Sequence, residues 1–484
     1  MKGKTTAVLL GLIVACGFAL RLRAANHPYI SQWDEAYHAL VAKNLLAHPL
    51  EPTLYEEKVL PADDHEWTKA RVWLHKPPLP MWLMAGGIAV FGESELAFRL
   101  PSVCLDTLAI LLVFLLAGEL FGLERKEAGL IAASVYALNP LMIRLVSGTV
   151  PDDAPHVINV FFITLTVLLF VVSARKQSRA YAAAAGLSLG LGTLCMSAVA
   201  LLALAASLPL LNARRGYWCL TAVPAFLLTA LPWPLYASSR WPDLWRLESG
   251  IQLDHLFHAL DGHAHAWWWH LSLVPVHYGG RIIAAALLAA MVYAARRKKA
   301  QVALLWIALP YAFFSLIATK LYAYACVAVP AMALLAGFAG AALWASGRAG
   351  KAALAAAILI ALVPRVRADY SICPWNERYD YPIFRRATMA LRELPGKKVI
   401  LNVGDNKSPQ AMFYSGATAY PEPPTPALVR DLLARGYQVF VLLDEETRGA
   451  EFLPALKKAG LEKKVRLYLV PSPLSRTPLH PYEA

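Results

Sequence analysis

Long runs of apolar residues, separated by short polar stretches, fill the first three quarters of the chain. A helix needs about 20 apolar residues to cross the hydrocarbon core of a bilayer, so the pattern predicts an all-α polytopic membrane domain with about 11–13 transmembrane helices. The runs cover residues 5–20, 98–121, 127–148, 154–173, 179–196, 197–211, 217–237, 268–294, 300–318, 321–346 and 350–366, and a shorter one at 77–91 is either re-entrant or a further span.

The first run, residues 5–20, has two alternative interpretations. A basic start followed by an apolar core also describes a secretory signal peptide. However, the run continues through Phe18, Ala19 and Leu20, beyond Cys16, where a lipoprotein cleavage site would lie. Because many more spans follow, we expect an uncleaved anchor.

Basic residues fall on alternate connections between the runs, on the same side as Lys2 and Lys4. Short loops rich in Lys and Arg stay in the cytoplasm. We therefore expect a cytoplasmic N-terminus, with the loops 24–76 and 238–267 and the C-terminal tail on the extracytoplasmic side. The basic residues are Arg125, Lys126, Arg175, Lys176, Arg179, Arg214, Arg215, Arg296, Arg297, Lys298, Lys299, Arg348 and Lys351.

The last quarter of the chain has the charge content of an ordinary water-soluble domain. Residues 365–484 carry 18 Lys and Arg and 13 Asp and Glu. Short apolar segments at 398–403, 438–443 and 465–470 are typical of strands, and 426–435 is typical of a helix. We therefore expect two domains: a transmembrane domain over 1–366, which includes the long loop 24–76, and a small extracytoplasmic α/β domain over 367–484.

The composition agrees with a membrane protein. The 484 residues are 58% hydrophobic and 16% charged, whereas globular chains are about 45–50% apolar and about 25% charged. A soluble enzyme, a disordered protein and a disulfide-stapled secreted module are thereby excluded. The net charge of +13 reflects the basic loops in large part and forms no basic face of the kind that binds nucleic acid.

Carboxylates that lie close to the membrane on the extracytoplasmic side are the first candidates for chemistry, because a charge beside hydrocarbon is costly. Asp34 and Glu35 follow the first run. The structural alternative is a solvated helix start, where acidic side chains are favoured. Asp152 and Asp153 form a second acidic turn, and Asp152 could instead cap the next helix.

Two lysines and a group of histidines complete the candidates. His75 and Lys76 precede a proline-rich approach to an apolar run, and Lys320 lies between two runs. Lysines at such positions either meet a lipid phosphate or only snorkel to the headgroups. The loop 255–270, which contains His265, is rich in His and Trp. It could ligate a metal or serve as an aromatic anchor at the membrane interface.

Five motifs, taken in their order along the chain, resemble those of the bacterial branch of the protein O-mannosyltransferase-like glycosyltransferases, which includes the aminoarabinose transferases that modify lipid A. The resemblance covers about residues 5–346. It implies the GT-C fold, an active site outside the cytoplasm at the bacterial inner membrane, and a sugar donor linked to undecaprenyl phosphate. The motifs are DEAY from Asp34, KPPLPMWL from Lys76, FGESELAFRLPS from Phe91, TVPDDAP from Thr149 and TKLYAYACVAVP from Thr319.

The resemblance also implies roles for individual residues. Asp34 becomes the catalytic carboxylate of the first loop, with Glu35 beside it. Asp153, which Ala154 and Pro155 follow as in the family pattern, becomes the carboxylate of the second loop, with Asp152 before it.

Donor and metal binding are implied in the same way. Lys76 matches the lysine that meets the donor phosphate, and Lys320, with Tyr324 close behind it, matches the later lysine of the donor region. In the aminoarabinose branch, an acidic residue before the first of these lysines contributes to a metal site with a later histidine. His75 stands at that position and could ligate a divalent ion (zinc, magnesium or manganese) together with His265.

One motif departs from the family pattern. The family commonly has a lysine in a pattern like GLxFLTKG, whereas the chain reads GLGTLCMS from Gly190, with Met196 in place of the lysine. One cation of the donor phosphate site is therefore missing.

The function implied is inverting transfer of a sugar from a polyprenyl phosphate to lipid A, another glycan or a protein. An aspartate can take the acceptor's proton, and cations can stabilise the departing phosphate. No nucleotide cofactor is expected, because no glycine-rich phosphate loop is present. The alternatives are a transporter or flippase of lipid-linked sugars, although the chain shows no repeated halves, and an oligosaccharide ligase or polymerase.

Overall fold

The chain folds into two compact units. The computed structural model describes residues 3–31, 33–61, 66–122, 126–150, 153–207, 217–260, 262–297, 300–370, 381–404, 407–443 and 452–469. What we call the helical unit comprises Met1–Asn26, Leu74–Pro80 and Arg99–Ser371. What we call the mixed unit comprises His27–Trp73, Met81–Phe98 and Ile372–Ala484.

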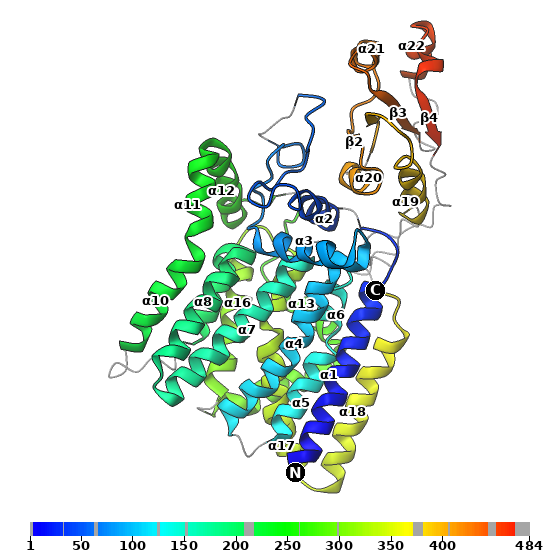
Figure 1. Cartoon of the computed structure of the whole chain (residues 1–484). Coiled ribbons are helices and arrows are strands. Elements are labelled where there is room, and N and C mark those ends of the chain that lie inside the picture. The colour runs from blue at the N-terminus through cyan, green and yellow to red at the C-terminus, as the bar shows by residue number, and fades with distance from the viewer. Residues whose placement is uncertain are drawn as a thin grey trace. The chain divides into compact units, whose positions relative to one another are not determined.

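Long helices that pack side by side form the helical unit (Figure 1). Two helices have residues in both units: α3 (Leu79–Phe91) and α4 (Glu95–Phe121). Its other elements are α1 (Gly3–Ala25), α5 (Lys126–Ala137), α6 (Pro140–Leu145), α7 (Asp153–Lys176), α8 (Arg179–Met196), η1 (Ser197–Leu201), α9 (Leu202–Ala206), α10 (Tyr217–Ala230), α11 (Pro232–Arg240), α12 (Pro242–Phe257), α13 (Trp269–Ser272), α14 (Val274–Tyr278), α15 (Arg281–Ala295), α16 (Gln301–Leu316), η5 (Tyr322–Ala328), α17 (Val329–Ala345) and α18 (Arg348–Arg367).

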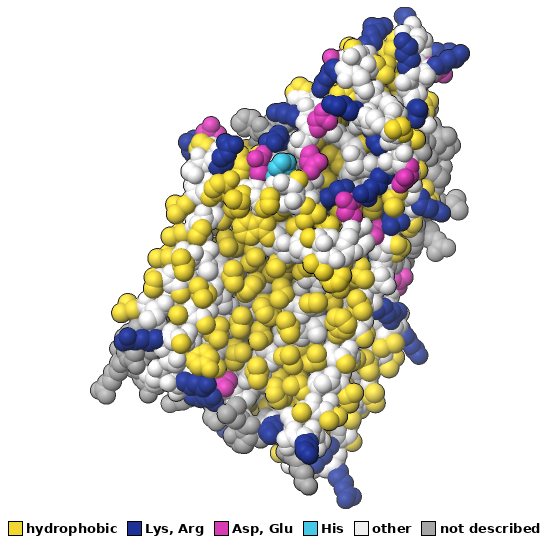
Figure 2. All heavy atoms as spheres, viewed as in Figure 1, with side chains coloured by type: hydrophobic (Ala, Val, Ile, Leu, Met, Phe, Trp, Pro, Cys, Tyr) yellow, Lys and Arg dark blue, Asp and Glu magenta, His cyan; other side chains and the backbone are white. Residues whose placement is uncertain are grey.

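The prediction of an all-α polytopic membrane domain is confirmed. Figure 2 shows hydrophobic side chains covering these helices, with Lys and Arg gathered at the end where the N-terminus lies. Among the described residues, three shorter apolar helices (α3, α15 and α16) accompany seven that are long and apolar enough to cross a bilayer. The seven are Gly3–Ala25, Glu95–Phe121, Pro155–Lys176, Arg179–Leu201, Leu220–Arg240, Tyr322–Ala345 and Arg348–Arg367.

Several predicted runs are interrupted, so the described full-length spans are fewer than the about 11–13 expected from hydropathy. The run 127–148 breaks between α5 and α6, where Pro140 opens α6 and the Asn139 side chain accepts a hydrogen bond from Met142 N at 3.0 Å. The run 268–294 breaks before α15 at Gly279, which has a φ of 98°. The positive φ at Gly279 favours glycine, whereas Pro140 has the fixed φ that suits the first turn of a helix, and hydropathy registers neither.

A buried ion pair joins α1, α4 and α5. Arg21 Nε donates to Asp106 Oδ2 at 2.5 Å, and the side chains of both residues are 0% exposed. The Tyr136 hydroxyl donates to the second oxygen of Asp106 at 2.5 Å, and Arg21 Nη1 donates to Ala137 O at 3.0 Å. A charge at this depth is retained only when it is paired in this way.

The mixed unit contains a four-stranded parallel sheet with strand order β2-β1-β3-β4. The predicted strands β1 (Lys398–Leu401), β3 (Gln438–Leu443) and β4 (Arg466–Leu469) and the predicted helix α21 (Pro426–Ala434) are present. Hydropathy did not predict β2 (Thr418–Ala419), α19 (Tyr381–Ala390), α20 (Ser408–Ser415), α22 (Phe452–Lys458) or η6 (Glu462–Lys464).

The first long loop folds together with the C-terminal tail. Helix α2 (Asp34–Asn44), which follows the first span, packs on α20, and residues 27–73 belong to the same compact unit as residues 372–484. The division into a domain over 1–366 and one over 367–484 stays a prediction from composition.

Candidate functional site

Helix α12 holds the backbone and the side chain of His75. Gln252 Nε2 donates to His75 O at 3.1 Å, and His75 Nδ1 lies 3.1 Å from Glu248 Oε2, with both of these side chains buried. Glu248 and Gln252 lie one turn apart, so they present their side chains on one face of the helix. Lys76, which is half-buried, follows His75 directly and is thereby positioned by α12.

The same helix holds the segment that carries Lys320. Ala318 N donates to Leu256 O and Thr319 N donates to His255 O, each at 3.1 Å. Lys320 N donates to His263 O, also at 3.1 Å, just beyond the end of α12. The connection between α16 and η5 is therefore fixed along its whole length.

These contacts bring the residues directly before the two predicted phosphate-binding lysines to neighbouring turns of one helix. On α12, Gln252 holds His75 and His255 holds Thr319. These two positions of the helix are separated by a rise of about 5 Å. Lys76 and Lys320 each lie one residue beyond the segment so held. The sequence predicted residues 238–267 as a loop and so did not indicate what joins these two lysines.

The Lys320 ammonium is withdrawn from solvent. Its Nζ donates to Ile317 O at 2.6 Å, and the residue is 5% exposed. Burial lowers the pKa of this lysine from its ordinary value. An anion that approached the ammonium would restore its preference for the charged form.

Tyr324 links this segment to the second acidic turn. Its ring centroid lies 4.7 Å from that of Phe314 and 5.8 Å from that of His156. His156 lies in the first turn of α7, which begins at Asp153. The start of α7 and the Lys320 segment are therefore brought together, whereas Asp152 lies outside the described residues.

The described residues do not fit a metal site at His75 and His265. His75 lies against Glu248, and His265 stacks on Trp269 with ring centroids 4.1 Å apart and planes within 1°. Burial, followed by the nearby His263 and Lys320, lowers the pKa of His265. Protein metal sites need three or four ligands, and no three His, Cys, Asp or Glu of the described part of the chain gather in one place.

Asp34 opens α2 after an unusual turn. Trp33, directly before it, has a φ of 62°, a conformation that residues other than glycine rarely adopt. Asp34 is half-buried, whereas Glu35 is 1% exposed and its Oε2 accepts a hydrogen bond from Ser31 N at 2.6 Å. Glu35 therefore stabilises the turn from which Asp34 projects, and both residues lie in the mixed unit.

Met196 ends α8 at the position where the family pattern has lysine. The next residue, Ser197, has a φ of 46°, and the chain continues as the 3-10 helix η1. The end of α8 thus carries an apolar side chain and contributes no cation.

Sequence comparison places the chain near lipid-linked sugar transferases. Residues 75–234 match the family of dolichyl-phosphate-mannose-protein mannosyltransferases. Over 281 residues the chain is 34% identical to the undecaprenyl phosphate-alpha-4-amino-4-deoxy-L-arabinose arabinosyl transferase of Pseudomonas aeruginosa (strain LESB58), a match that covers 55% of this chain and 50% of that protein. A similarly named transferase of Pseudomonas fluorescens (strain Pf0-1) is 28% identical over 278 residues, or 55% of this chain and 48% of that protein. The chain therefore spans about half the length of these relatives.

Structure comparison extends the likeness to the whole fold. ArnT from Cupriavidus metallidurans, in its crystal structure with undecaprenyl phosphate, superimposes with a TM-score of 0.65 at 16% identity and covers 96% of this chain and 90% of its own. The archaeal oligosaccharyltransferase AglB from Archaeoglobus fulgidus, in complex with an inhibitory peptide and a dolichol-phosphate, gives 0.56 at 13% identity over 86% and 64%. The predicted GT-C fold and the resemblance to the aminoarabinose transferases are confirmed.

Proposed function

We propose that this chain, an ArnT-like protein of the GT-C fold, is a multi-pass inner-membrane glycosyltransferase that moves a sugar from a polyprenyl phosphate to an extracytoplasmic acceptor. The observation that carries the proposal is that His75 and Thr319, the residues directly before Lys76 and Lys320, are held by neighbouring turns of α12. Two ammonium groups on adjacent segments suit a phosphate that gains charge as the sugar leaves. The undecaprenyl phosphate in the related ArnT structure supports the same class of donor.

In the proposed reaction, the bond between the anomeric carbon and the phosphate oxygen breaks, and the electron pair goes to the phosphate. A hydroxyl of the acceptor forms the new bond from the opposite face, and its proton passes to the Asp34 carboxylate. Asp153 is the proposed second carboxylate, which orients the acceptor. The products are the glycosylated acceptor and polyprenyl phosphate, and Lys76 and Lys320 hold the latter until it leaves.

We assign the site to the extracytoplasmic side. Helix α7 begins at Asp153 and ends at Lys176, and α8 begins at Arg179. Lys320 follows the end of α16, whose start follows the basic pair Arg296 and Arg297. The proposed site therefore lies at helix ends opposite the basic ones, and the positive-inside rule assigns those basic ends, with the N-terminus, to the cytoplasm. The C-terminal tail is then periplasmic.

Sugar transfer by the purified protein tests the proposal. The protein in nanodiscs is given a radiolabelled undecaprenyl-phosphate aminoarabinose and, in parallel, other sugars on the same lipid, with lipid A, a glycan or a periplasmic protein extract as acceptor. We expect a glycosylated acceptor with one added sugar, and loss of transfer in Asp34→Asn while the protein stays folded. Normal transfer by that variant would exclude Asp34 as the base.

Two other outcomes would replace the proposal. Movement of the labelled lipid across a proteoliposome membrane without covalent product would favour a flippase. Transfer of a whole sugar chain, seen in the mass of the acceptor, would favour an oligosaccharide ligase or polymerase.

A further inference from the structure

Two side chains of α20 hold a single residue of the first loop. The Tyr414 hydroxyl accepts a hydrogen bond from Ile30 N at 2.7 Å, and Gln410 Nε2 donates to Ile30 O at 2.6 Å. Tyr414 and Gln410 lie one turn apart on α20, and all three residues are buried. Both backbone polar groups of Ile30 are therefore held by the C-terminal part of the chain.

Tyr414 is itself fixed by the ion pair of the buried Glu95 with the half-buried Arg385. Its hydroxyl donates to Glu95 Oε1 at 3.0 Å, and Arg385 Nε donates to the same oxygen at 2.5 Å. The Arg385 guanidinium also lies over the Tyr414 ring, 5.6 Å from its centroid. The hydroxyl thus accepts from Ile30 N and donates to Glu95, so its orientation toward Ile30 is determined.

The residues after Ile30 form the strained turn that precedes Asp34. Trp33 has a φ of 62° and a ψ of −134°, and its carbonyl accepts the first hydrogen bonds of α2, from Ala36 N at 2.9 Å and Tyr37 N at 3.2 Å. A non-glycine residue keeps such a conformation only where its surroundings impose it, and such strain clusters at functional sites. The direction in which α2 presents Asp34 therefore depends on what holds this turn.

We propose that α20 is a positioning element for the catalytic carboxylate. Tyr414 and Gln410 hold Ile30, and Ile30 in turn maintains the Trp33 turn that aims Asp34. The C-terminal part of the chain thereby takes part in the reaction without touching substrate. This assignment rests on the proposed function, in which Asp34 accepts the proton of the acceptor.

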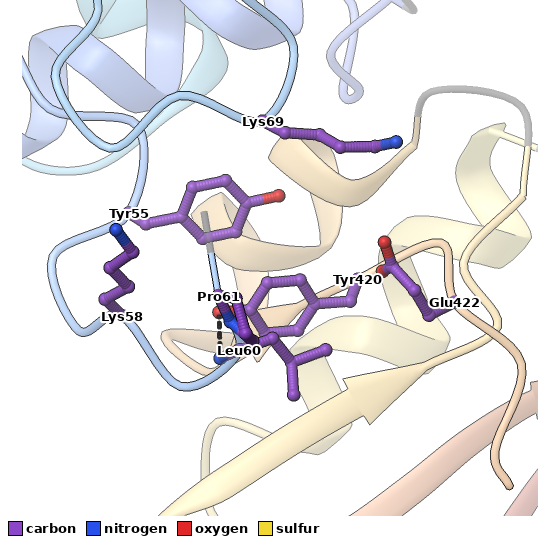
Figure 3. Close-up of a pocket in the computed structure, with 7 residues that line it drawn as sticks. All are labelled: Tyr55, Lys58, Leu60, Pro61, Lys69, Tyr420 and Glu422. Atoms are coloured by element: carbon purple, nitrogen blue, oxygen red, sulfur yellow. Dashed lines mark hydrogen bonds between the residues drawn. The ribbon is translucent and has the colours of Figure 1, made fainter. Parts of the chain in front are cut away.

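A second attachment of the same loop supplies a matched control. The Tyr420 hydroxyl accepts hydrogen bonds from Val59 N at 3.1 Å and Leu60 N at 3.0 Å, and its ring stacks on Tyr55 with centroids 5.1 Å apart. Figure 3 shows the two rings lying face to face beside Leu60. Tyr420, like Tyr414, is a buried tyrosine bonded to the backbone of the first loop, but its backbone partners are Val59 and Leu60 and not a residue beside the Trp33 turn.

The test compares Tyr414→Phe with Tyr420→Phe in the full-length protein. Amide hydrogen exchange, measured without substrate, should become faster over residues 30–37 in Tyr414→Phe and only around residues 59–60 in Tyr420→Phe. In the transfer assay, kcat of Tyr414→Phe should fall about 10- to 100-fold, because displacement of a catalytic group by about 1 Å has an effect of that size. KM for the lipid donor should stay unchanged, and Tyr420→Phe should keep the kcat of the wild type.

The proposal is overturned if the two variants lower kcat equally, or if Tyr414→Phe speeds exchange at the turn and leaves kcat unchanged. If Tyr414→Phe does not fold, Gln410→Met removes the other bond to Ile30 and is expected to give the same result. Failure of the proposed function is distinguishable, because it would appear as no covalent transfer by the wild-type protein, or as normal transfer by Asp34→Asn, whatever the exchange at the turn.

Discussion

The carboxylate of Glu248 lies 3.1 Å from the imidazole of His75, and both side chains are buried in the helical unit. A carboxylate in this position holds one tautomer and one orientation of the ring. Lys76 follows directly in the chain, so the pair also determines how this lysine is presented. The functional importance of Glu248 can be tested separately from that of the lysines.

Glu248→Ala should weaken donor binding and leave kcat almost unchanged. Loss of the buried contact between Glu248 and His75 Nδ1 costs about 1–3 kcal/mol. We therefore expect KM for the lipid-linked sugar to rise about tenfold as the segment shifts. Asp243→Ala is the control on the same helix, because its pair with Arg246 is exposed and such pairs contribute little. Equal KM values for the two variants would contradict a positioning role.

Lys320→Met should reduce affinity for undecaprenyl phosphate. A charge-assisted hydrogen bond contributes about 1.5–3 kcal/mol, so the Kd should rise about 10- to 100-fold. Lys351→Met provides the control, because Lys351 lies near the start of α18 and is exposed. Binding of the lipid to nanodiscs, measured by microscale thermophoresis, checks the result, and unchanged affinity in Lys320→Met would exclude this lysine from the phosphate site.

As the pH rises, affinity for the donor should be lost at a lower pH than it would be if Lys320 had the ordinary pKa of a lysine. Burial lowers the pKa of Lys320, so in the empty site the ammonium loses its proton at a lower pH than a lysine in water. The cation binds phosphate and the neutral amine does not, so affinity is retained below the lowered pKa and is lost as the pH rises through it. A Kd series across the alkaline range measures the effect, and Lys320→Arg should move the loss to higher pH because arginine stays protonated.

Breaking the Arg21–Asp106 pair should destabilise the helical unit. Removal of one partner from a buried pair costs about 3–5 kcal/mol, because the remaining charge is left uncompensated. Arg21→Met should therefore lower the thermal unfolding temperature in detergent. Arg21→Met with Asp106→Leu should recover part of the loss, since the double variant buries no charge. A double variant less stable than the single one would contradict this explanation.

Hydropathy predicted those elements whose ends coincide with a change in composition. Strand β3 has the predicted bounds, 438–443, because turn and charged residues flank its apolar segment. Helix α8 also has the predicted bounds, 179–196, and its start is marked by the charged residues Lys176 and Arg179. Helix α12 was missed because it mixes apolar residues with Asp, Glu, Arg and His and so contains no apolar run. Its role in the site could not be predicted from the hydropathy of a short stretch of sequence.

The candidate site was predictable in its residue types and not in its connections. Asp34, Lys76 and Lys320 stand out as charges beside apolar runs. This signal can be recognised in one sequence alone. Glu248 does not stand out, because its burial depends on His75, which lies 173 positions earlier. Tyr414 is an ordinary tyrosine until its bond to Ile30, 384 positions away, is known.

The folding of the first loop with the C-terminal tail has a consequence for how the protein is made. Gln410 and its partner Ile30 are separated by 380 positions, and at about 5–20 residues per second a ribosome needs about 20–80 s to travel between them. During that interval the loop has left the translocation channel without the helix that completes its fold. We therefore expect the Asp34 turn to become fixed only after translation has passed Tyr414, and a chain cut before α20 lacks the side chains that hold Ile30.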